Sequence, residues 1–226
     1  MKINNKPLEM FHMRVNSFTY QPLSADRVMF QPEQSLKCVL GRLEIKPKNM
    51  KLVAEFRNKL DISNFLAELL RHKENIIDID DGFQYRCFLT SIGDMVDEYW
   101  QGWYRISLPI LAIQEGSRRI VHLNKAINHV QVAGNWTTDC LFEITPHKNM
   151  ESFTIHGYKI TKLYRNRTVY LDGELKRVYS STEPNKYADC VLKNNVFPYL
   201  DPGLQIIQMD STVDVTVILK YTPIYV

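Results

Sequence analysis

The stretch NNVFPYLDPGLQIIQM, Asn194–Met209, decides the fold of the second half of the chain. Pro198 and Pro202 each restrict their own φ angle to one narrow range, and the tripeptide Asp-Pro-Gly at 201–203 is typical of a chain reversal. The aliphatic run that follows favours a strand. We therefore predict a structural turn that closes the edge of a hydrophobic core, and its residues are Phe197, Pro198, Leu200, Pro202 and Gly203.

Alternation of apolar and polar residues extends this strand pattern over most of the chain. In Lys51–Arg57, Leu52, Ala54 and Phe56 alternate against Lys51, Glu55 and Arg57, which is the period of a sheet with one face in solvent. Further β-branched or aromatic runs separated by Gly, Pro and Asn are Phe83–Ile92, Trp103–Ile113, His129–Gly134, Cys140–Pro146, Ser152–Ile160, Thr168–Gly173 and Val213–Val226. The pattern predicts a mainly β protein of antiparallel sandwiches.

One short amphipathic helix is predicted near residues 62–72. Its apolar stripe has helical spacing and consists of Ile62, Phe65, Leu66, Leu69 and Leu70. Asp61 or Ser63 is expected to cap the first turn. Glu68, Arg71 and Lys73 are expected on the opposite, solvent face.

A break near residues 114–135, which contains the polar stretch QEGSRRIVHLNKAIN, separates the half that contains the helix from a half with no helical pattern. A chain of 226 residues can form one large β domain or two domains of about 100 residues, each with its own core. We therefore predict two β-sandwich domains, at residues 1–127 and 128–226.

Composition and charge argue against several classes of protein. Lys and Arg (28) nearly balance Asp and Glu (25), so the net charge of +3 is far from that of a dedicated nucleic-acid binder. The N-terminal sequence has no apolar signal-peptide core, and no run of 18 apolar residues occurs, so we expect no membrane segment. The four cysteines are widely separated, and we expect reduced thiols within strands: Cys38, Cys87, Cys140 and Cys190.

The sequence contains no catalytic or cofactor motif, and we predict no catalytic, cofactor-binding or metal-binding residues. The acidic cluster IDIDDG fails the calcium-loop register, because its first and twelfth positions would be Ile77 and Phe88. Asp80, Asp81 and Gly82 are better explained as a hairpin turn. The six histidines lack zinc-site spacing, and the nine glycines form no phosphate loop.

The aromatic cluster EYWQGWYR, Glu98–Arg105, is the one candidate for carbohydrate binding. In a single strand Trp100 and Tyr104 would share one face and Tyr99 and Trp103 the other, which equally fits core or interface packing. A carbohydrate-binding module or host adhesin is thus an alternative hypothesis, and it requires Trp100, Trp103 or Trp136 to be exposed in a concave patch. A cell-wall glycosidase is a third, and it requires two converging carboxylates.

The second half of the chain resembles the distal tail protein family of siphophages, the long-tailed bacteriophages. The resemblance rests on TVYLDGELKRV (168–178), NKYADCVLKNNVFPYLDPGLQIIQM (185–209) and DVTVILKY (214–221). Gly134-Asn135 before Cys140–Pro146, and the strand Phe153–Ile160, add weaker matches. In the first half only the order of the elements agrees, and Gln205 stands where the family commonly has Asn.

The resemblance implies a structural protein without enzymatic activity or cofactor. In this family a ring-forming N-terminal domain and a galectin-like C-terminal β-sandwich assemble as a hexameric ring, the hub that joins the tail tube to the baseplate or tail tip. Its expected partners are copies of itself, the major tail tube protein and the tail-tip or baseplate proteins, while DNA passes through without specific binding. Such a protein is part of the virion and is assembled in the cytoplasm of the host bacterium.

Overall fold

The computed structural model describes residues 1–20, 25–30, 39–91, 93, 95–100, 102–210 and 214–226. The chain divides into two compact units, Met1–Glu115 and Gly116–Val226. Each unit encloses its own cluster of buried apolar side chains. The division falls before the expected 127/128 because the strand β11, Arg119–Leu123, pairs with β21, Val215–Tyr221, and so belongs to the second unit.

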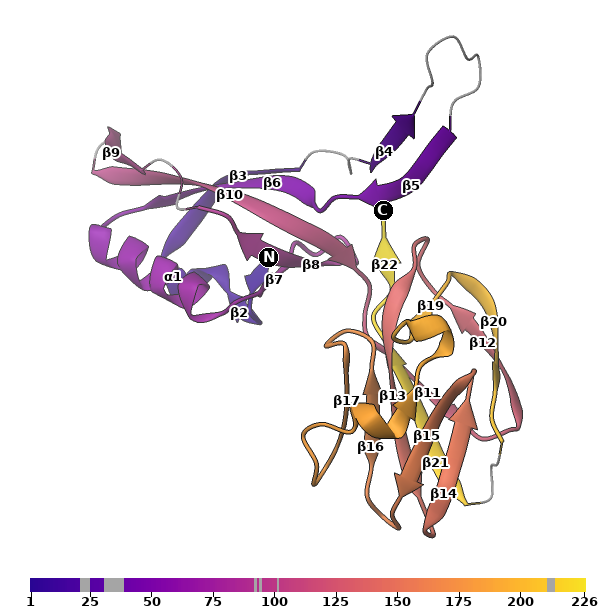
Figure 1. Ribbon diagram of the computed structural model, residues 1–226. Coiled ribbons are helices and arrows are strands. Elements are labelled where there is room, and N and C mark those ends of the chain that lie inside the picture. Colours follow the sequence, from indigo (N-terminus) through magenta and orange to yellow (C-terminus); the bar gives the residue numbers. More distant parts are fainter. Residues whose placement is uncertain (21–24, 31–38, 92, 94, 101, 211–213) are drawn as a thin grey trace. The chain divides into compact units, whose positions relative to one another are not determined.

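The first unit is an antiparallel sheet with one α-helix against it (Figure 1). The sheet runs in the order β2-β1-β7-β8-β10-β6-β3, β9 pairs with β10, and β4 pairs with β5 in a separate hairpin. The elements are β1 Lys2–Ile3, β2 Lys6–Pro7, the 3-10 helix η1 Leu8–Phe11, β3 Met13–Tyr20, β4 Ala25–Phe30, β5 Val39–Ile45, β6 Lys48–Phe56, α1 Lys59–Arg71, β7 Asn75–Asp78, β8 Gln84–Leu89, β9 Met95–Trp100 and β10 Trp103–Glu115.

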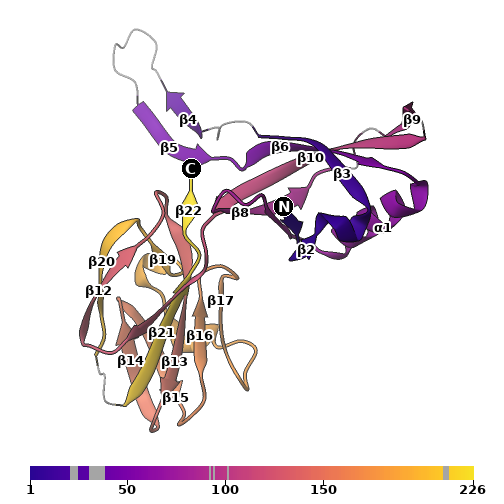
Figure 2. The ribbon, with the colours of Figure 1, turned by 180° about the vertical axis from the view of Figure 1, so that it is seen from behind.

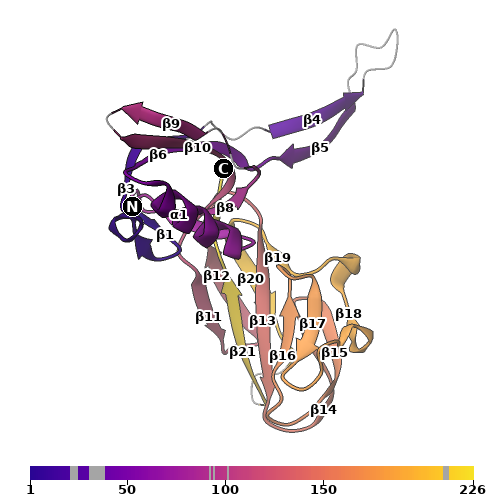
Figure 3. The ribbon, with the colours of Figure 1, turned by 90° about the vertical axis from the view of Figure 1, so that its left-hand side faces the viewer.

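The core of the first unit lies between α1 and the sheet, and Figure 3 shows the helix along one side of β6 and β10. The predicted alternation in β6 is confirmed, since Leu52, Ala54 and Phe56 are all fully buried. Directly opposite them on β10 stand Leu108, Ile106 and Tyr104. From the helix, Ile62, Phe65 and Leu69 pack into the same cluster.

The helix is confirmed, but its start and its faces differ from prediction. Neither Asp61 nor Ser63 is the cap, because α1 begins at Lys59 and the side chain of Asn58 accepts a hydrogen bond from the Asp61 amide at 2.8 Å. Leu70 is 59% exposed. Glu68 is buried instead of solvent-facing, since its carboxylate accepts a 2.7 Å hydrogen bond from Lys6 of β2.

The acidic cluster forms the predicted hairpin turn between β7 and β8. Asp80 and Gly82 have left-handed φ angles of 63° and 88°. The carboxylate of Asp81 accepts hydrogen bonds from the amide of Phe83 at 3.0 Å and from the hydroxyl of Tyr85 at 2.6 Å. The acids therefore hold the turn together.

The aromatic cluster Glu98–Arg105 was expected to lie in a single strand. This expectation is wrong, because the cluster belongs to the hairpin between β9 and β10. Gly102 lies in the turn with a φ of 80°, and Trp100 pairs with Trp103 across it. Chain reversal removes the two-face arrangement expected from a continuous strand.

The second unit is a β-sandwich (Figure 2). One sheet has the order β11-β21-β13-β16-β17, with β19 also pairing with β13. The other side contains the two-stranded sheet β12-β20 and the three-stranded sheet β14-β15-β18. The remaining elements are β12 Ile127–Val132, β13 Thr138–Pro146, β14 Met150–Ile155, β15 Tyr158–Leu163, β16 Val169–Asp172, β17 Arg177–Ser180, η2 Tyr187–Asp189, β18 Cys190–Val191, η3 Lys193–Asn195, β19 Tyr199–Leu200, β20 Gly203–Gln208 and β22 Ile224–Tyr225.

A backbone bridge between Ile155 and Met209 joins the two groups of strands on that other side. The side chains that face inward from both sides form one cluster that includes Phe142, Phe153 and Leu219, each fully buried. The mainly β, sandwich-type fold predicted from the sequence is therefore confirmed.

Two predicted strands of this unit are interrupted. Ser152–Ile160 is the hairpin β14–β15, because His156 and Gly157 adopt φ angles of 50° and 88° and reverse the chain. The closing strand ends at Tyr221, and a short β22 follows Pro223. A proline cannot donate the hydrogen bond that would continue the ladder.

Candidate functional site

The turn predicted from Asn194–Met209 lies where three segments of the second unit meet. Pro198 is buried, Leu200 is 1% exposed, and Phe197 packs half-buried against the core. Pro202 is exposed, and Gly203 begins β20 with a φ of 96°, a conformation that favours glycine. All five residues therefore surround the connection from β18 to β20.

Backbone hydrogen bonds join this turn to two other segments of the family resemblance. The amide of Cys140 donates to the carbonyl oxygen of Pro198 at 3.2 Å, and the amide of Gly173 donates to the carbonyl oxygen of Cys140 at 2.9 Å. A β-carbon on Gly173 would lie 1.9 Å from the Pro198 oxygen. The motif residues thus form a structural joint and offer no reactive group to a substrate.

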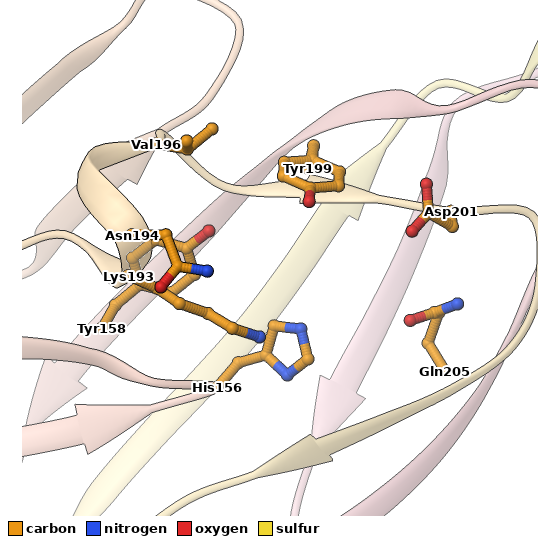
Figure 4. Close-up of a pocket in the computed structure, with 8 residues that line it drawn as sticks. All are labelled: His156, Tyr158, Lys193, Asn194, Val196, Tyr199, Asp201 and Gln205. Carbon is orange, nitrogen blue, oxygen red and sulfur yellow. The ribbon is translucent and has the colours of Figure 1, made fainter.

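A small pocket lies beside this joint. Its volume is about 170 Å³, and Figure 4 shows the eight side chains that line it: His156, Tyr158, Lys193, Asn194, Val196, Tyr199, Asp201 and Gln205. Lys193 lies next to His156 on one side, and Asp201 and Gln205 lie on the other. The pocket was not predicted, because it forms only where the β14–β15 hairpin, with His156 and Tyr158, meets residues 193–205 of the turn region, and no local pattern indicates that contact.

Hydrogen bonds fix the segments that line the pocket. The amide of His156 donates to Gln208 at 2.8 Å and holds the β14–β15 turn in place, and the carboxylate of Asp201 accepts from the hydroxyl of Thr137 at 3.0 Å. Asn194 has a left-handed φ of 52°. Burial, together with the positive charge of Lys193, lowers the pKa of His156, so this imidazole is neutral at pH 7.

Among the other titratable groups, burial holds several thiols and phenols in their protonated form. It raises the pKa of Cys87 to about 12 and that of Cys190 to about 11, and it also raises those of Cys140, Tyr85 and Tyr158. Cys87, Cys140 and Cys190 are free thiols in strands, as predicted, whereas Cys38 lies outside the described residues. A protonated thiol is a poor nucleophile.

The tryptophans have no shared patch among the residues whose side chains the structure describes. Trp103 is half-buried under the guanidinium of Arg57, which lies 5.0 Å from its ring centroid. Trp136 is half-buried and bridges through its backbone to Ile224. The side chain of Trp100 lies outside the described set. The tryptophan-based carbohydrate hypothesis therefore gains no support from the described residues.

Within the residues that the structure describes, no three His, Cys, Asp or Glu side chains converge as a metal site would require. No helix in that part of the chain is long and apolar enough to cross a membrane.

An apolar surface strip lies on the outer side of the β12–β20 pair. Leu204 is 62% exposed, Ile127 51% and Ile206 49%. His129 stands directly opposite Ile206, and Gln131 stands opposite Leu204. Their neighbours Val130 and Ile207 point inward and are buried. Exposed aliphatic side chains gathered in this way are typical of a protein contact surface.

A fold of this kind, a helix-bearing β unit followed by a β-sandwich, also occurs in a phage hub protein and in phage baseplate structures. The crystal structure of the Dit protein (gp 19.1) of phage SPP1, described as a paradigm of the hub adsorption apparatus in phages that infect Gram-positive bacteria, has a TM-score of 0.74 to this chain. The match covers 100% of this chain and 98% of that one, at 10% sequence identity.

Two structures of the phage P2 baseplate in its activated conformation are also similar. With Ca the TM-score is 0.56, and with Sr it is 0.54; in both, the match covers 92% of this chain and 90% of the other at 9% identity. No protein-family profile matches the sequence, and no curated protein sequence matches it. The likeness is therefore one of fold, and it extends over both units.

Proposed function

We propose that this chain is a structural component of a bacteriophage tail, the distal tail hub that connects the tail tube to the baseplate or tail tip. The observation that carries the proposal is the match to a hub protein over 100% of this chain and 98% of that one, because both units and their order agree. A shared fold alone leaves function open. The resemblance at 168–221, which involves the joint of Cys140, Gly173 and Pro198, adds a second argument.

The first unit has the properties of a ring-forming domain. In the described chain its sheet is open, and it ends at β2 on one side and β3 on the other. Open edges present unpaired backbone groups, and head-to-tail pairing in a closed ring protects them. We infer a hexameric ring made by residues 1–115, with the sandwich of residues 116–226 as a galectin-like docking platform.

The chemistry of the chain agrees with assembly without catalysis. A net charge of +3 is too small for tight, counterion-releasing contact with DNA, so DNA would pass through the ring without specific binding. The partners are other copies of the chain, the tail tube protein and the tail-tip or baseplate proteins. The protein would be assembled in the host cytoplasm and carried in the virion.

Size-exclusion chromatography with light scattering on the full-length protein tests the proposal. The expected result is a species six times the 26.5 kDa mass of one chain, with rings in negative-stain images. Antibody labelling of virions should mark the end of the tail tube distal to the head. A protein that stays monomeric at high concentration, together with unlabelled tails, would exclude the hub.

A further inference from the structure

The pocket beside the Phe197–Gly203 turn contains a hydroxyl group that the protein itself does not use. Tyr158 is only 2% exposed, and in the described part of the chain its hydroxyl has no hydrogen-bond partner. No fully inaccessible side-chain oxygen or nitrogen in that part lacks a partner, so this hydroxyl is reached from the pocket. Figure 4 shows it on the side of the ring that points toward Tyr199.

Because this hydroxyl opens onto the pocket, it can form a hydrogen bond there with water or with a ligand group that enters from outside. A ligand hydroxyl that replaces the water keeps this hydrogen bond. Burial raises the pKa of this phenol, so it is available as a neutral donor and acceptor.

The charges around the pocket favour a neutral ligand over a simple ion. Lys193 and Asp201 lie on opposite sides, and His156 between them is neutral at pH 7. An anion would meet the Asp201 carboxylate, and a cation would meet the Lys193 ammonium. A neutral ligand that both donates and accepts hydrogen bonds fits this arrangement.

The remaining groups narrow the ligand class further. Lys193 and Asn194 supply donors, and Asp201 and Gln205 supply acceptors. Tyr199, 43% exposed, offers an aromatic ring to an apolar C–H face. The volume of about 170 Å³ is below the ~300–1,000 Å³ of pockets that enclose drug-sized ligands, and it suits a group the size of one six-membered ring.

We propose that this pocket binds one pyranose residue of a glycan, with its hydroxyl groups on Tyr158, Asp201 and Gln205 and one C–H face on Tyr199. This site is separate from the tryptophans that the sequence suggested for carbohydrate binding. It does not depend on the hub role, since a ring protein and a monomer could each carry it.

Saturation-transfer NMR on the full-length protein tests the site, with the methyl glycosides of glucose, galactose, N-acetylglucosamine and rhamnose as probes. We expect transfer to at least one of them. Tyr158→Phe should weaken that binding about tenfold, the effect of one lost hydrogen bond. It should leave the thermal unfolding temperature unchanged or raise it, because the hydroxyl has no partner in the protein.

Tyr170→Phe is the matched control. Tyr170 lies on β16 in the other sheet, where its ring stacks on Tyr179 at 4.8 Å, so this variant should bind the sugar as the parent protein does. Absence of transfer to all four glycosides would overturn the proposal. Equal affinity in the Tyr158→Phe variant would overturn it as well, because the sugar would then bind elsewhere.

Discussion

The carbonyl oxygen of Pro198 occupies the space that a side chain on Gly173 would need. A β-carbon at residue 173 would approach that oxygen to 1.9 Å and the carbonyl oxygen of Cys140 to 2.8 Å. Both neighbours are backbone atoms in paired segments, so neither can move aside alone. The Asp-Gly pair at the end of β16 and the Phe-Pro turn before β19 are therefore one packing unit, although they are distant in sequence.

Gly173→Ala should destabilise the protein by more than about 3 kcal/mol, because overlap with two backbone carbonyls forces the joint open. Urea unfolding measures the change. Gly203→Ala is the control: its φ of 96° disfavours alanine, but its β-carbon meets no atom within 4 Å. It should cost only about 1–2 kcal/mol. Equal losses for the two variants would contradict the steric explanation.

Alanine substitutions at neighbouring residues of β20 should differ sharply in their effect on the free energy of unfolding. Ile207 is fully buried in the second core, so Ile207→Ala should cost about 2–5 kcal/mol. Ile206 and Leu204 face outward, and alanine at either position should change stability by no more than about 0.5 kcal/mol. Thermal unfolding of the three single variants tests this. A large loss at Leu204 would show that the strand register is wrong.

The N-terminal cap of α1 is Asn58 in the structure, whereas the sequence pattern suggested Asp61 or Ser63, and two substitutions distinguish Asn58 from Ser63. Asn58→Ala should cost about 1 kcal/mol, because the amide of Asp61 loses its acceptor. Ser63→Ala lies inside the helix and is exposed, so it should be neutral or slightly stabilising. Denaturation of both variants decides between them, and the reverse order would restore Ser63 as the cap.

An ion network in the second unit should make stability depend on pH. Lys186, 3% exposed, contacts Glu183 at 3.1 Å and Asp189 at 2.9 Å, and Lys162 contacts the other oxygen of Asp189 at 2.9 Å. Hydrogen bonds from Lys162 and Lys186 hold the pKa of the Asp189 carboxyl below its ordinary value. Its contribution is thus complete above the unfolded-state pKa and is lost as the pH falls through the lower, folded-state pKa.

Asp189→Asn should therefore lower stability at pH 7 and reduce the loss of stability on acidification below about pH 4. Urea unfolding at pH 7 and at two acidic pH values measures both effects. Asp139→Asn is a suitable control, because its contact with Lys176 at 2.8 Å joins two exposed side chains. If both variants kept the pH dependence of the parent protein, the network would have no role in it.

The thiols of the folded protein should react slowly. Cys87 and Cys140 are 2% exposed with raised pKa values, and that of Cys190 is about 11. In a Cys38→Ser variant, a thiol-specific reagent at pH 8 should label the remaining three cysteines only as the protein unfolds. Rapid labelling of Cys190, the half-buried one, would indicate that β18 opens in the native state.

Local patterns identified most of the strands because burial on one face imposes a period of two, and Leu52, Ala54 and Phe56 show it directly. The errors share a cause. The helical pattern predicts Glu68 in solvent because its partner, Lys6, is distant in sequence. The strand expected at Ser152–Ile160 missed the reversal at His156, since only the glycine after it marks the turn.

The sequence by itself determined a mainly β chain with one amphipathic helix, because hydrophobic periodicity is a local property of each segment. It also identified the Phe197–Gly203 turn, since proline and glycine restrict or extend the backbone wherever they occur. The tertiary structure decided how Gly173, Cys140 and Pro198 meet, and it alone assembled the pocket around Tyr158. Those relationships depend on contacts between distant segments, which the turn residues allow but do not specify.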